Sequence, residues 1–294
     1  MTKIIDGKAF AAEIRAEIAR EVEKIKAAGE QIPGLAVIMV GDDPASAIYV
    51  KSKEKQAQEV GFLSTVIRLP AETSQAEVLD VIDKLNRNPD YHGILLQLPV
   101  PAHLDKDALI AAISPKKDVD GFHPENVGKL WYSDREHQTA IPCTPLGCSL
   151  ILERYVGSDL NGKNAVMIGA SNVVGKPMAA LLLRMGATVS ICHSTTLDVA
   201  EYARNADILI VATGNAHLVK ASWVKEGAVV LDVGINRLAD GSIVGDVDFE
   251  AVKDKTAAIT PVPGGIGPMT IACLLKNTLT LRKTKALSSN TNTE

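Results

Sequence analysis

The chain has 294 residues, of which 46% are hydrophobic and 22% charged, an ordinary balance for a globular protein with room for two domains. Its formal net charge is −4 and neither half is strongly basic, so nucleic acid is not an expected partner. No apolar run is long enough to span a membrane, so no membrane partner is expected either. The N-terminus lacks the apolar core of a signal peptide, and the four cysteines lack zinc-like spacing. The cytoplasm, reduced thiols and no metal are therefore expected.

Strand and helix patterns alternate through the first part of the chain. Apolar runs predict buried strands at 35–40 and 93–98, and a further strand is predicted between them at 63–69. Helices are predicted at 9–26, from Pro44 (capped by Asp43) to about 60, from the capping box of Ser74 and Glu77 onward, and at 104–113. This alternation predicts a parallel sheet with helices on both sides.

Residues 114–140 break the alternation, because they hold two prolines, several charges and little periodicity. They are interpreted as a functional loop followed by a crossing between domains. A second series follows, with helices predicted from Thr144 to about 156 and at 175–185, and strands at 164–168, 188–192, 207–212 and 228–232. A Pro/Gly-rich turn at 259–268 precedes a last helix at 269–281, and the polar end is expected to fray.

Tyr49 and Lys53 are four residues apart on a predicted helix, so they share one face at roughly 5–6 Å between Cβ atoms. Such a pair can transfer a proton to a bound substrate, or Lys53 can be one of several solvated lysines. Gln97 closes the third strand. Because ligands gather at the carboxyl ends of parallel strands, Gln97 can meet Lys53, unless its amide only satisfies local backbone groups.

Asp118 and Asp120 lie two residues apart in the stretch KDVDGF. They are interpreted either as acids that face a ligand or as a turn stabilised by Asx hydrogen bonds. No third ligand follows at a suitable spacing, so the pair does not predict a metal site.

Residues 166–177 have the pattern of a strand, a glycine turn and a helix start, which is typical of dinucleotide-binding sites. Gly169 permits the tight turn, Ser171 occupies the place of the second glycine in G-x-G-x-x-G, and Gly175 lets the helix approach the sheet. The N–H groups at the helix start would then face a pyrophosphate. The alternative is a tight turn without a ligand.

The next strand ends in SICHSTT, where an NAD site usually offers a carboxylate to the ribose. Here the nearest acid is Asp198, beyond several hydroxyl groups. Ser194 and Thr195 could donate to a 2′-phosphate and Lys176 could add charge, so NADP is favoured and NAD stays open. His193 is alternatively a surface histidine.

Eight stretches, covering nearly all of the chain outside its ends, share one resemblance. They are YVKSK (49–53), GILLQLPVP (93–101), PKKDVDGFHPENVGKL (115–130), PCTPLG (142–147), IGASNVVGKPM (168–178), CHSTT (192–196), DVGINR (232–237) and TPVPGGIGPMT (260–270). In this order they closely resemble the bifunctional methylenetetrahydrofolate dehydrogenase/cyclohydrolase family. The resemblance implies a homodimer that oxidises 5,10-methylenetetrahydrofolate with NADP. It then hydrolyses the methenyl product to 10-formyltetrahydrofolate.

The resemblance also implies roles for single residues. Lys53 resembles the general acid/base of the hydrolytic step, Tyr49 the residue that orients the folate, and Gln97 the partner that tunes the lysine. Asp120 resembles the acid that grips the pterin edge. The backbone lining the folate site corresponds to Pro263, Gly264 and Gly265, and the NADP contacts correspond to Gly169, Ala170, Ser171, Ser194 and Ile235. Some relatives carry Arg at the position of Ala170 and others at that of Lys176, so Lys176 is a conditional substitute.

The sequence also has features of three other classes of protein. A Tyr-x-x-x-Lys pair also occurs in short-chain dehydrogenases, but there it follows the glycine turn, whereas here it precedes it. The others are an NADP-dependent dehydrogenase of another small substrate, such as a shikimate-type enzyme, and a nucleotide-binding module without catalysis. The KDVDGF and TPVPGG stretches disfavour the dehydrogenase of another substrate. Intact Lys53, Gln97 and Asp120 disfavour the module without catalysis.

The expected architecture is α/β with two lobes. Residues 1–138 form a folate-binding catalytic domain, and residues 139–267 form a Rossmann-type NADP-binding domain with a parallel sheet. The C-terminal helix at 268–285 is expected to pack back on the first lobe, before a flexible tail at 286–294.

Overall fold

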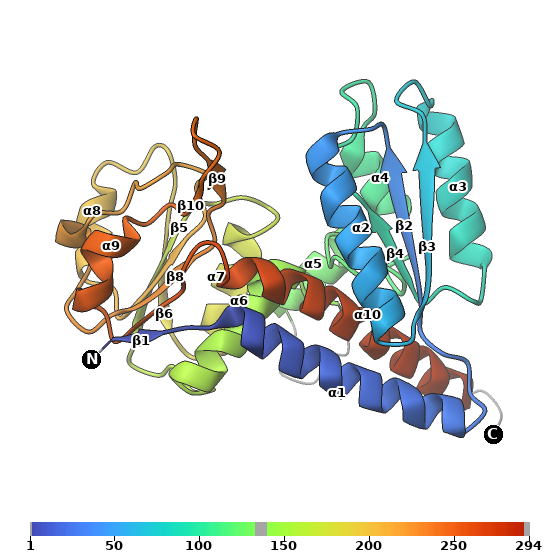
Figure 1. The fold of residues 1–294 in the computed structure, drawn as a ribbon, viewed down its shortest axis with the longest axis horizontal. Coiled ribbons are helices and arrows are strands. Elements are labelled where there is room, and N and C mark those ends of the chain that lie inside the picture. The colour runs from blue at the N-terminus through green and yellow to red at the C-terminus, as the bar shows by residue number, and fades with distance from the viewer. Residues whose placement is uncertain (1, 133–139, 291–294) are drawn as a thin grey trace. The chain divides into compact units, whose positions relative to one another are not determined.

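The computed structural model describes residues 2–132 and 140–290 (Figure 1). The chain divides into two compact units, each of the α/β type. We call Met1–Ala12 with Pro142–Cys273 the six-stranded unit, and Glu13–Ile141 with Leu274–Glu294 the three-stranded unit. Helices α1 (Gly7–Ala27) and α10 (Ile266–Asn290) begin in the six-stranded unit and continue in the three-stranded unit.

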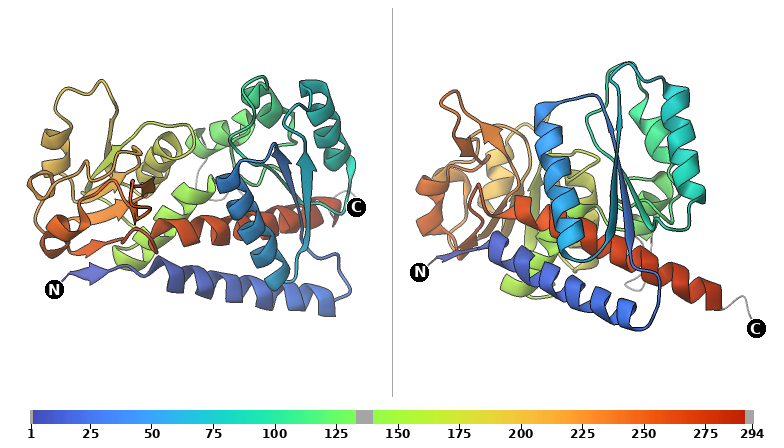
Figure 2. Two further views of the ribbon diagram at one scale, coloured as in Figure 1. Left: turned by 45° about the horizontal axis from the view of Figure 1, so that its top comes forward. Right: turned by 45° about the vertical axis from the view of Figure 1, so that its right-hand side comes forward.

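The three-stranded unit holds a parallel sheet in the order β3-β2-β4. Its elements are β2 (Gly34–Val40), α2 (Pro44–Glu59), β3 (Leu63–Leu69), α3 (Gln75–Arg87), β4 (Gly93–Leu96), α4 (Lys106–Ala112) and α5 (Pro124–Tyr132). Helix α2 lies on one face of the sheet, and α3 and α4 lie on the other (Figures 1 and 2). Alternate residues of β2, such as Ala36 and Ile38, pack with Val78 and Ile82 of α3 in one buried core, which fixes the register.

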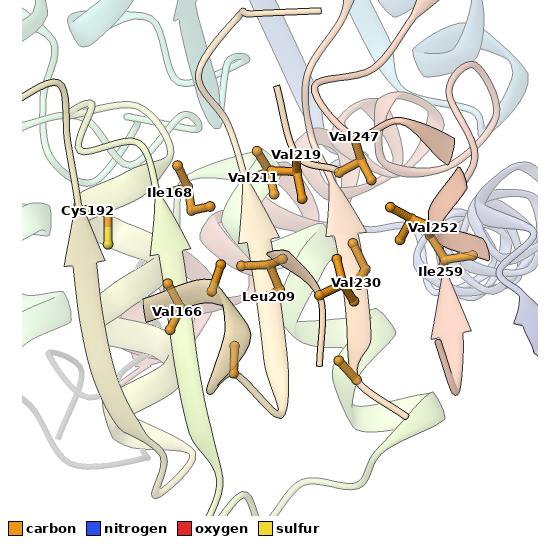
Figure 3. Packing of buried hydrophobic residues seen from close by; sticks show 14 residues of the cluster. Val166, Ile168, Cys192, Leu209, Val211, Val219, Val230, Val247, Val252 and Ile259 are labelled. Carbon is orange, nitrogen blue, oxygen red and sulfur yellow. The ribbon is translucent and has the colours of Figure 1, made fainter. Parts of the chain in front are cut away.

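The six-stranded unit holds an all-parallel sheet in the order β1-β11-β8-β7-β5-β6. Its strands are β1 (Lys3–Ile4), β5 (Asn164–Ile168), β6 (Thr188–Cys192), β7 (Ile208–Val211), β8 (Val229–Asp232) and β11 (Ala258–Ile259), with a hairpin of β9 (Asn236–Arg237) and β10 (Ile243–Val244). Its helices are α6 (Cys143–Tyr155), α7 (Gly175–Arg184), α8 (Val199–Arg204) and α9 (Phe249–Val252), with 3-10 segments η1 (Ala221–Trp223) and η2 (Lys253–Lys255). Val166, Leu209 and Val230, from neighbouring strands, meet in the core shown in Figure 3.

The predicted fold class, α/β with two parts and a parallel sheet, is confirmed. The interpretation of residues 114–140 as a loop is wrong in part, because they contain α5, whose Asn126 and Leu130 are buried on one side. The last helix begins at Ile266, inside the predicted turn. It continues to Asn290, and residues 291–294 of the predicted tail lie outside the described residues.

The predicted domain limits stay a prediction, and the contact-based units differ from them at the N-terminus. Strand β1 pairs with β11, Lys3 opposite Ala258 and Ile4 opposite Ile259, so the first residues belong with the six-stranded sheet. The predicted boundary between residues 138 and 139 lies outside the described residues. Within the described ranges, no helix is both long and apolar enough to cross a membrane.

His92, just before β4, links folding to pH. It is 4% exposed, and its Nδ1 accepts the Gly34 N–H at 3.1 Å. Burial, together with the nearby charges of Lys285, Arg282 and Lys117, lowers the pKa of His92 from 6.5 to about 4. The unfolded chain therefore binds more protons than the folded chain in this interval, so stability is lost as the pH falls from 6.5 towards 4.

We expect His92→Asn to reduce this acid-side loss of stability. Asparagine keeps an acceptor for the Gly34 N–H but does not titrate in this range. Urea unfolding of both proteins, from neutral pH down to about 4, measures the slope of unfolding free energy against pH. Equal slopes in the two proteins would contradict the assignment.

Candidate active site

Helix α2 starts directly beyond the carboxyl end of β2. The Asp43 carboxylate accepts the Ser46 N–H at 2.7 Å and Pro44 takes the first helical position, as the sequence predicts. The same hydrogen bond lowers the pKa of Asp43, which keeps the cap ionised. Tyr49 and Lys53 therefore stand one turn apart, near the start of a well-capped helix.

Lys53 meets Gln97 at this edge of the sheet. The Lys53 Nζ donates to the Gln97 Oε1 at 2.9 Å. Gln97 is held through both its backbone and its side chain. Its backbone N–H donates to Ile38 O at 2.8 Å, and its Nε2 donates to Leu98 O at 2.6 Å. The strand order explains the meeting: β2 and β4 are neighbours, so the helix after β2 faces the residue after β4. The contact predicted from the sequence is present.

Tyr49 is 46% exposed, so much of its ring is open to a ligand. Aromatic rings of this kind stack on flat conjugated groups at little cost in side-chain entropy. Its role as a folate-orienting residue stays a prediction.

A second turn next to β4 carries Asp120. The buried Asp118 carboxylate accepts N–H groups from Gly121 at 3.0 Å and His123 at 2.9 Å, and the Asn126 side-chain amide at 2.9 Å. Asp118 is thus the Asx-type turn former that the sequence offered as one alternative. Asp118 forms an isolated parallel β-bridge with Ile94 of β4. The partly buried Asp120, two residues further on, therefore lies on a turn beside that strand.

Sequence reasoning missed Asn277 of α10, which supports the same turn. Its Nδ2 donates to Val119 O at 2.8 Å and to Ile141 O at 2.7 Å, and the residue is 4% exposed. A single asparagine in the apolar stretch IACLLKNTLTL is a signal for a buried polar contact. It does not indicate the partner.

In the six-stranded unit, the glycine turn follows β5 at the point where strand order reverses. Gly169 has φ +114°, and a Cβ there would lie 2.1 Å from Ala212 O. A Cβ on Gly175 would lie 2.0 Å from Gly169 O. Only glycine at both positions lets the ends of β5 and β7 and the start of α7 come this close.

One detail of the predicted turn is corrected. The Ser171 Oγ accepts the N–H groups of Val174 at 3.1 Å and Gly175 at 3.4 Å, and its carbonyl accepts the Lys176 N–H at 3.0 Å. The N–H groups at the helix start are therefore already bonded within the turn. Ala170 is partly buried there.

The end of β6 is polar and exposed. His193, Ser194 and Thr195 are all exposed, and the Thr195 Oγ1 lies 2.8 Å from the His193 Nδ1. Asp198, the nearest acid along the chain, caps α8 by accepting the Glu201 N–H at 3.0 Å. Asp198 is therefore used as a helix cap, and it does not replace the ribose-binding carboxylate that the sequence pattern lacks.

Lys176 and Ile235, two further residues that are predicted to contact the nucleotide, are both exposed. Lys176 is exposed and its Nζ donates to Asn172 Oδ1 at 2.7 Å, so the amine is held over the glycine turn. Ile235 follows β8 and is 51% exposed.

The three residues predicted to line the folate site, Pro263, Gly264 and Gly265, belong to the six-stranded unit, whereas Lys53, Gln97 and Asp120 belong to the other. Gly264 has φ +107° and its carbonyl accepts the Lys8 N–H at 3.1 Å. In the described residues, no group of three His, Cys, Asp or Glu side chains is placed to hold a metal ion.

Sequence reasoning also missed two buried acids, Asp232 and Asp246. They lie at the carboxyl ends of the strands of the six-stranded sheet, where the nucleotide is predicted to bind; we call this edge of the sheet the nucleotide edge. Burial and repulsion from Asp246 together raise the pKa of Asp232 to about 6, although N–H donors from Val247 and its neighbours act in the opposite direction. The signal in the sequence is that each acid lies close to a glycine in an apolar stretch, in VVLDVGIN and IVGDVDF.

The fold and these strand-end residues define a two-unit α/β protein with a nucleotide-binding turn in one unit and a Lys–Gln pair in the other. Comparison with known families agrees. Residues 5–120 match the catalytic-domain model of tetrahydrofolate dehydrogenase/cyclohydrolase, and residues 142–286 match its NAD(P)-binding-domain model. The chain therefore belongs to the tetrahydrofolate dehydrogenase/cyclohydrolase family.

Individual relatives cover almost the whole chain. The bifunctional protein FolD of Dichelobacter nodosus is 61% identical over 96% of this chain and 97% of its own, and that of Moorella thermoacetica is 56% identical over 94% and 97%. The crystal structure of FolD from Campylobacter jejuni has a TM-score of 0.94 and 51% identity, covering 97% of this chain and all of that one. The Trypanosoma brucei enzyme, complexed with NADP and an inhibitor, has a TM-score of 0.91 and 38% identity, covering 97% and 98%.

Proposed function

We propose that this protein oxidises 5,10-methylenetetrahydrofolate with NADP and hydrolyses the 5,10-methenyl product to 10-formyltetrahydrofolate. Family membership over both units supports the pair of reactions. The observation that carries the hydrolytic half is the hydrogen bond between Lys53 and Gln97 at the carboxyl ends of β2 and β4.

Lys53 is proposed as the general acid/base. A methenyl group is cationic, so like-charge repulsion favours a neutral amine beside it over an ammonium. A neutral amine can accept a proton from the attacking water and return it as the ring opens. Gln97 presents a carbonyl oxygen to Lys53, which holds the nitrogen in one place through both proton transfers.

Tyr49 and Asp120 are proposed to hold the folate. The exposed face of Tyr49 can stack on the pterin ring. Asp120 lies in a turn that Asp118 and Asn277 hold rigidly, which suits a carboxylate that accepts two N–H donors from a pterin edge. Backbone groups of Pro263, Gly264 and Gly265 are proposed as further folate contacts.

The nucleotide edge fits a dinucleotide, because Gly169 and Gly175 let the backbone of β5, β7 and α7 converge in the tight turn that is typical of such sites. Gly169, Ala170 and Ser171 would line the pyrophosphate, and Ile235 would contact the nicotinamide half. When bound, NADP supplies the acceptor for the hydride from the methylene carbon. Ser194 and Lys176 would offer a donor and a charge to the 2′-phosphate, which favours NADP over NAD.

The homodimer implied by the resemblance belongs to this proposal, as does a cytoplasmic location. Four buried cysteine thiols suit a reducing compartment. Light scattering of the purified protein tests the dimer, and a single monomer mass would overturn it.

We expect the purified protein, given methylenetetrahydrofolate and NADP, to form NADPH and 10-formyltetrahydrofolate. Absorbance of the reduced nicotinamide and chromatography of the folates measure the two steps separately. NAD in place of NADP serves as the comparison, and we expect it to react at least about tenfold less efficiently, because one charged contact to the 2′-phosphate is lost. Formation of neither product would refute the proposal and leave a nucleotide-binding module or another substrate.

A further inference from the structure

Asp232 and Asp246 are buried carboxylates in the six-stranded unit that the proposed reactions do not use. Asp232 is 3% exposed and Asp246 is fully buried. A carboxylate in a protein interior is costly unless several donors bind it. The donors therefore show what each acid holds in place.

Asp246 joins the turn after β7 to the loop after β8. Its Oδ2 accepts the N–H groups of Thr213 at 2.6 Å and Gly214 at 3.0 Å, and the Thr213 hydroxyl at 3.0 Å. Its Oδ1 accepts the Asn236 Nδ2 at 2.9 Å. Both oxygens are thus occupied by donors from two different strand ends.

Asp232 holds Asp246 in turn. Its Oδ1 accepts the N–H groups of Gly234 and Asp246, each at 3.0 Å, and its Oδ2 accepts the Val247 N–H at 2.8 Å. Its own backbone N–H donates to the buried Thr260 Oγ1 at 2.8 Å, just beyond β11. One hydrogen-bonded network therefore fixes the carboxyl ends of the neighbouring strands β11, β8 and β7.

Two glycines make room for the pair. A Cβ on Gly234 would lie 2.2 Å from the Asp246 Oδ1, and a Cβ on Gly245 would lie 1.9 Å from the Asp232 Oδ2. Neither contact could be relieved without moving a carboxylate that is already fully bonded. The glycines and the acids thus form one interlocked arrangement.

This network lies next to the glycine turn. Strand β7 is the neighbour of β5, and Ala212, directly before Thr213, is the residue whose carbonyl sits against Gly169. The loop after β8 carries the exposed Ile235, which lies in the sequence between Gly234 and Asn236, the two residues bound by the acids. The acids therefore fix backbone on both sides of the edge at which a dinucleotide would bind.

We propose that Asp246, supported by Asp232, is a positioning residue for dinucleotide binding, which rests on the proposed function of this edge. Asp246 acts through Thr213–Gly214 and through Asn236 and touches no ligand itself. Its loss should weaken NADP binding and leave hydrolysis of methenyltetrahydrofolate, which uses no nucleotide, unchanged.

The test exchanges the partners of one hydrogen bond. In Asp246→Asn, one carboxylate oxygen is replaced by an N–H₂ group, which can only donate. This group must face either the Asn236 N–H₂ or the three donors from Thr213 and Gly214. In both orientations, buried hydrogen-bond donors face one another without an acceptor. In Asp246→Asn with Asn236→Asp, the new amide can donate to the new carboxylate, and the clash is removed. Calorimetric titration with NADP measures binding, and methenyltetrahydrofolate hydrolysis without nucleotide measures the other half.

We expect Asp246→Asn to weaken NADP binding at least about tenfold, the double variant to recover most of that loss, and hydrolysis to stay within about twofold throughout. Unchanged NADP affinity in the single variant would overturn the proposal. So would a parallel fall of binding and hydrolysis that the double variant does not restore. A wild-type protein that neither hydrolyses methenyltetrahydrofolate nor binds NADP would instead refute the proposed function.

Should Asp246→Asn not fold, Thr213→Val decides the question with the same two assays. It removes one donor to Asp246 and adds no charge. Weaker NADP binding with normal hydrolysis supports the positioning role, and NADP affinity within about twofold of wild type contradicts it.

Discussion

Lys53→Met should lower the rate of methenyltetrahydrofolate hydrolysis by about 10²–10⁴-fold, the usual contribution of a general acid/base. Methionine has a similar length and fills the same space, so the change removes the proton carrier and the hydrogen bond to Gln97. Oxidation of methylenetetrahydrofolate needs no base in the hydride step, so it should fall no more than hydrolysis does. Stopped assays of each half reaction, started from its own substrate, measure the two rates.

Lys51→Met is the matched control for this variant. Lys51 lies on the same helix two residues away and is exposed, so the substitution makes the same chemical change outside the site. We expect both activities of the control to stay within about twofold of wild type. A Lys53→Met protein that hydrolyses methenyltetrahydrofolate at nearly the normal rate would show that another group moves the proton.

Gly175→Ala should abolish the dehydrogenase half selectively. The new Cβ would lie 2.0 Å from Gly169 O and 2.8 Å from the Ala170 Cα, and these backbone atoms cannot swing away as a side chain could. Helix α7 and the glycine turn must therefore separate, at a cost of about 1–3 kcal/mol in unfolding free energy. We expect NADP-dependent oxidation to fall at least about 100-fold, since it depends on that turn.

Hydrolysis of methenyltetrahydrofolate should persist in Gly175→Ala, because Lys53 and Gln97, which are proposed to move the proton, belong to the three-stranded unit. Gly128→Ala is the control: it sits inside α5, and a Cβ there would meet no heavy atom within 4 Å. That variant should gain about 0.5–1 kcal/mol in unfolding free energy and keep both activities. Normal oxidation by Gly175→Ala, or equal loss of both activities, would argue against a nucleotide site at this turn.

The regular parts of this fold are readable from sequence for a physical reason. Strands β5, β7 and β8 lie within one residue of the predicted ranges, because a buried parallel strand is a short apolar run that glycine or polar residues end. The contact between Lys53 and Gln97 follows from the same logic, since the ends of neighbouring parallel strands meet at one edge.

The features that escaped prediction depend on distant partners. Strands β1 and β11 are two residues each, too short to show a period, and pairing Lys3 with Ala258 leaves no local signal. The short helix α5 was not predicted, because the many charges of residues 114–132 leave little apolar periodicity. The roles of Asp232 and Asp246 come from donors on several strand ends, which only the folded chain brings together.

The central claim is that one protein passes a hydride from the one-carbon unit to NADP and then adds water to the same carbon. Mass spectrometry of a reaction started with methylene-dideuterated tetrahydrofolate in heavy-oxygen water tests both steps at once. We expect one deuterium on the reduced nucleotide, and one deuterium with one heavy oxygen on the 10-formyl group. Unlabelled reduced nucleotide, or no doubly labelled formyl product, would contradict it.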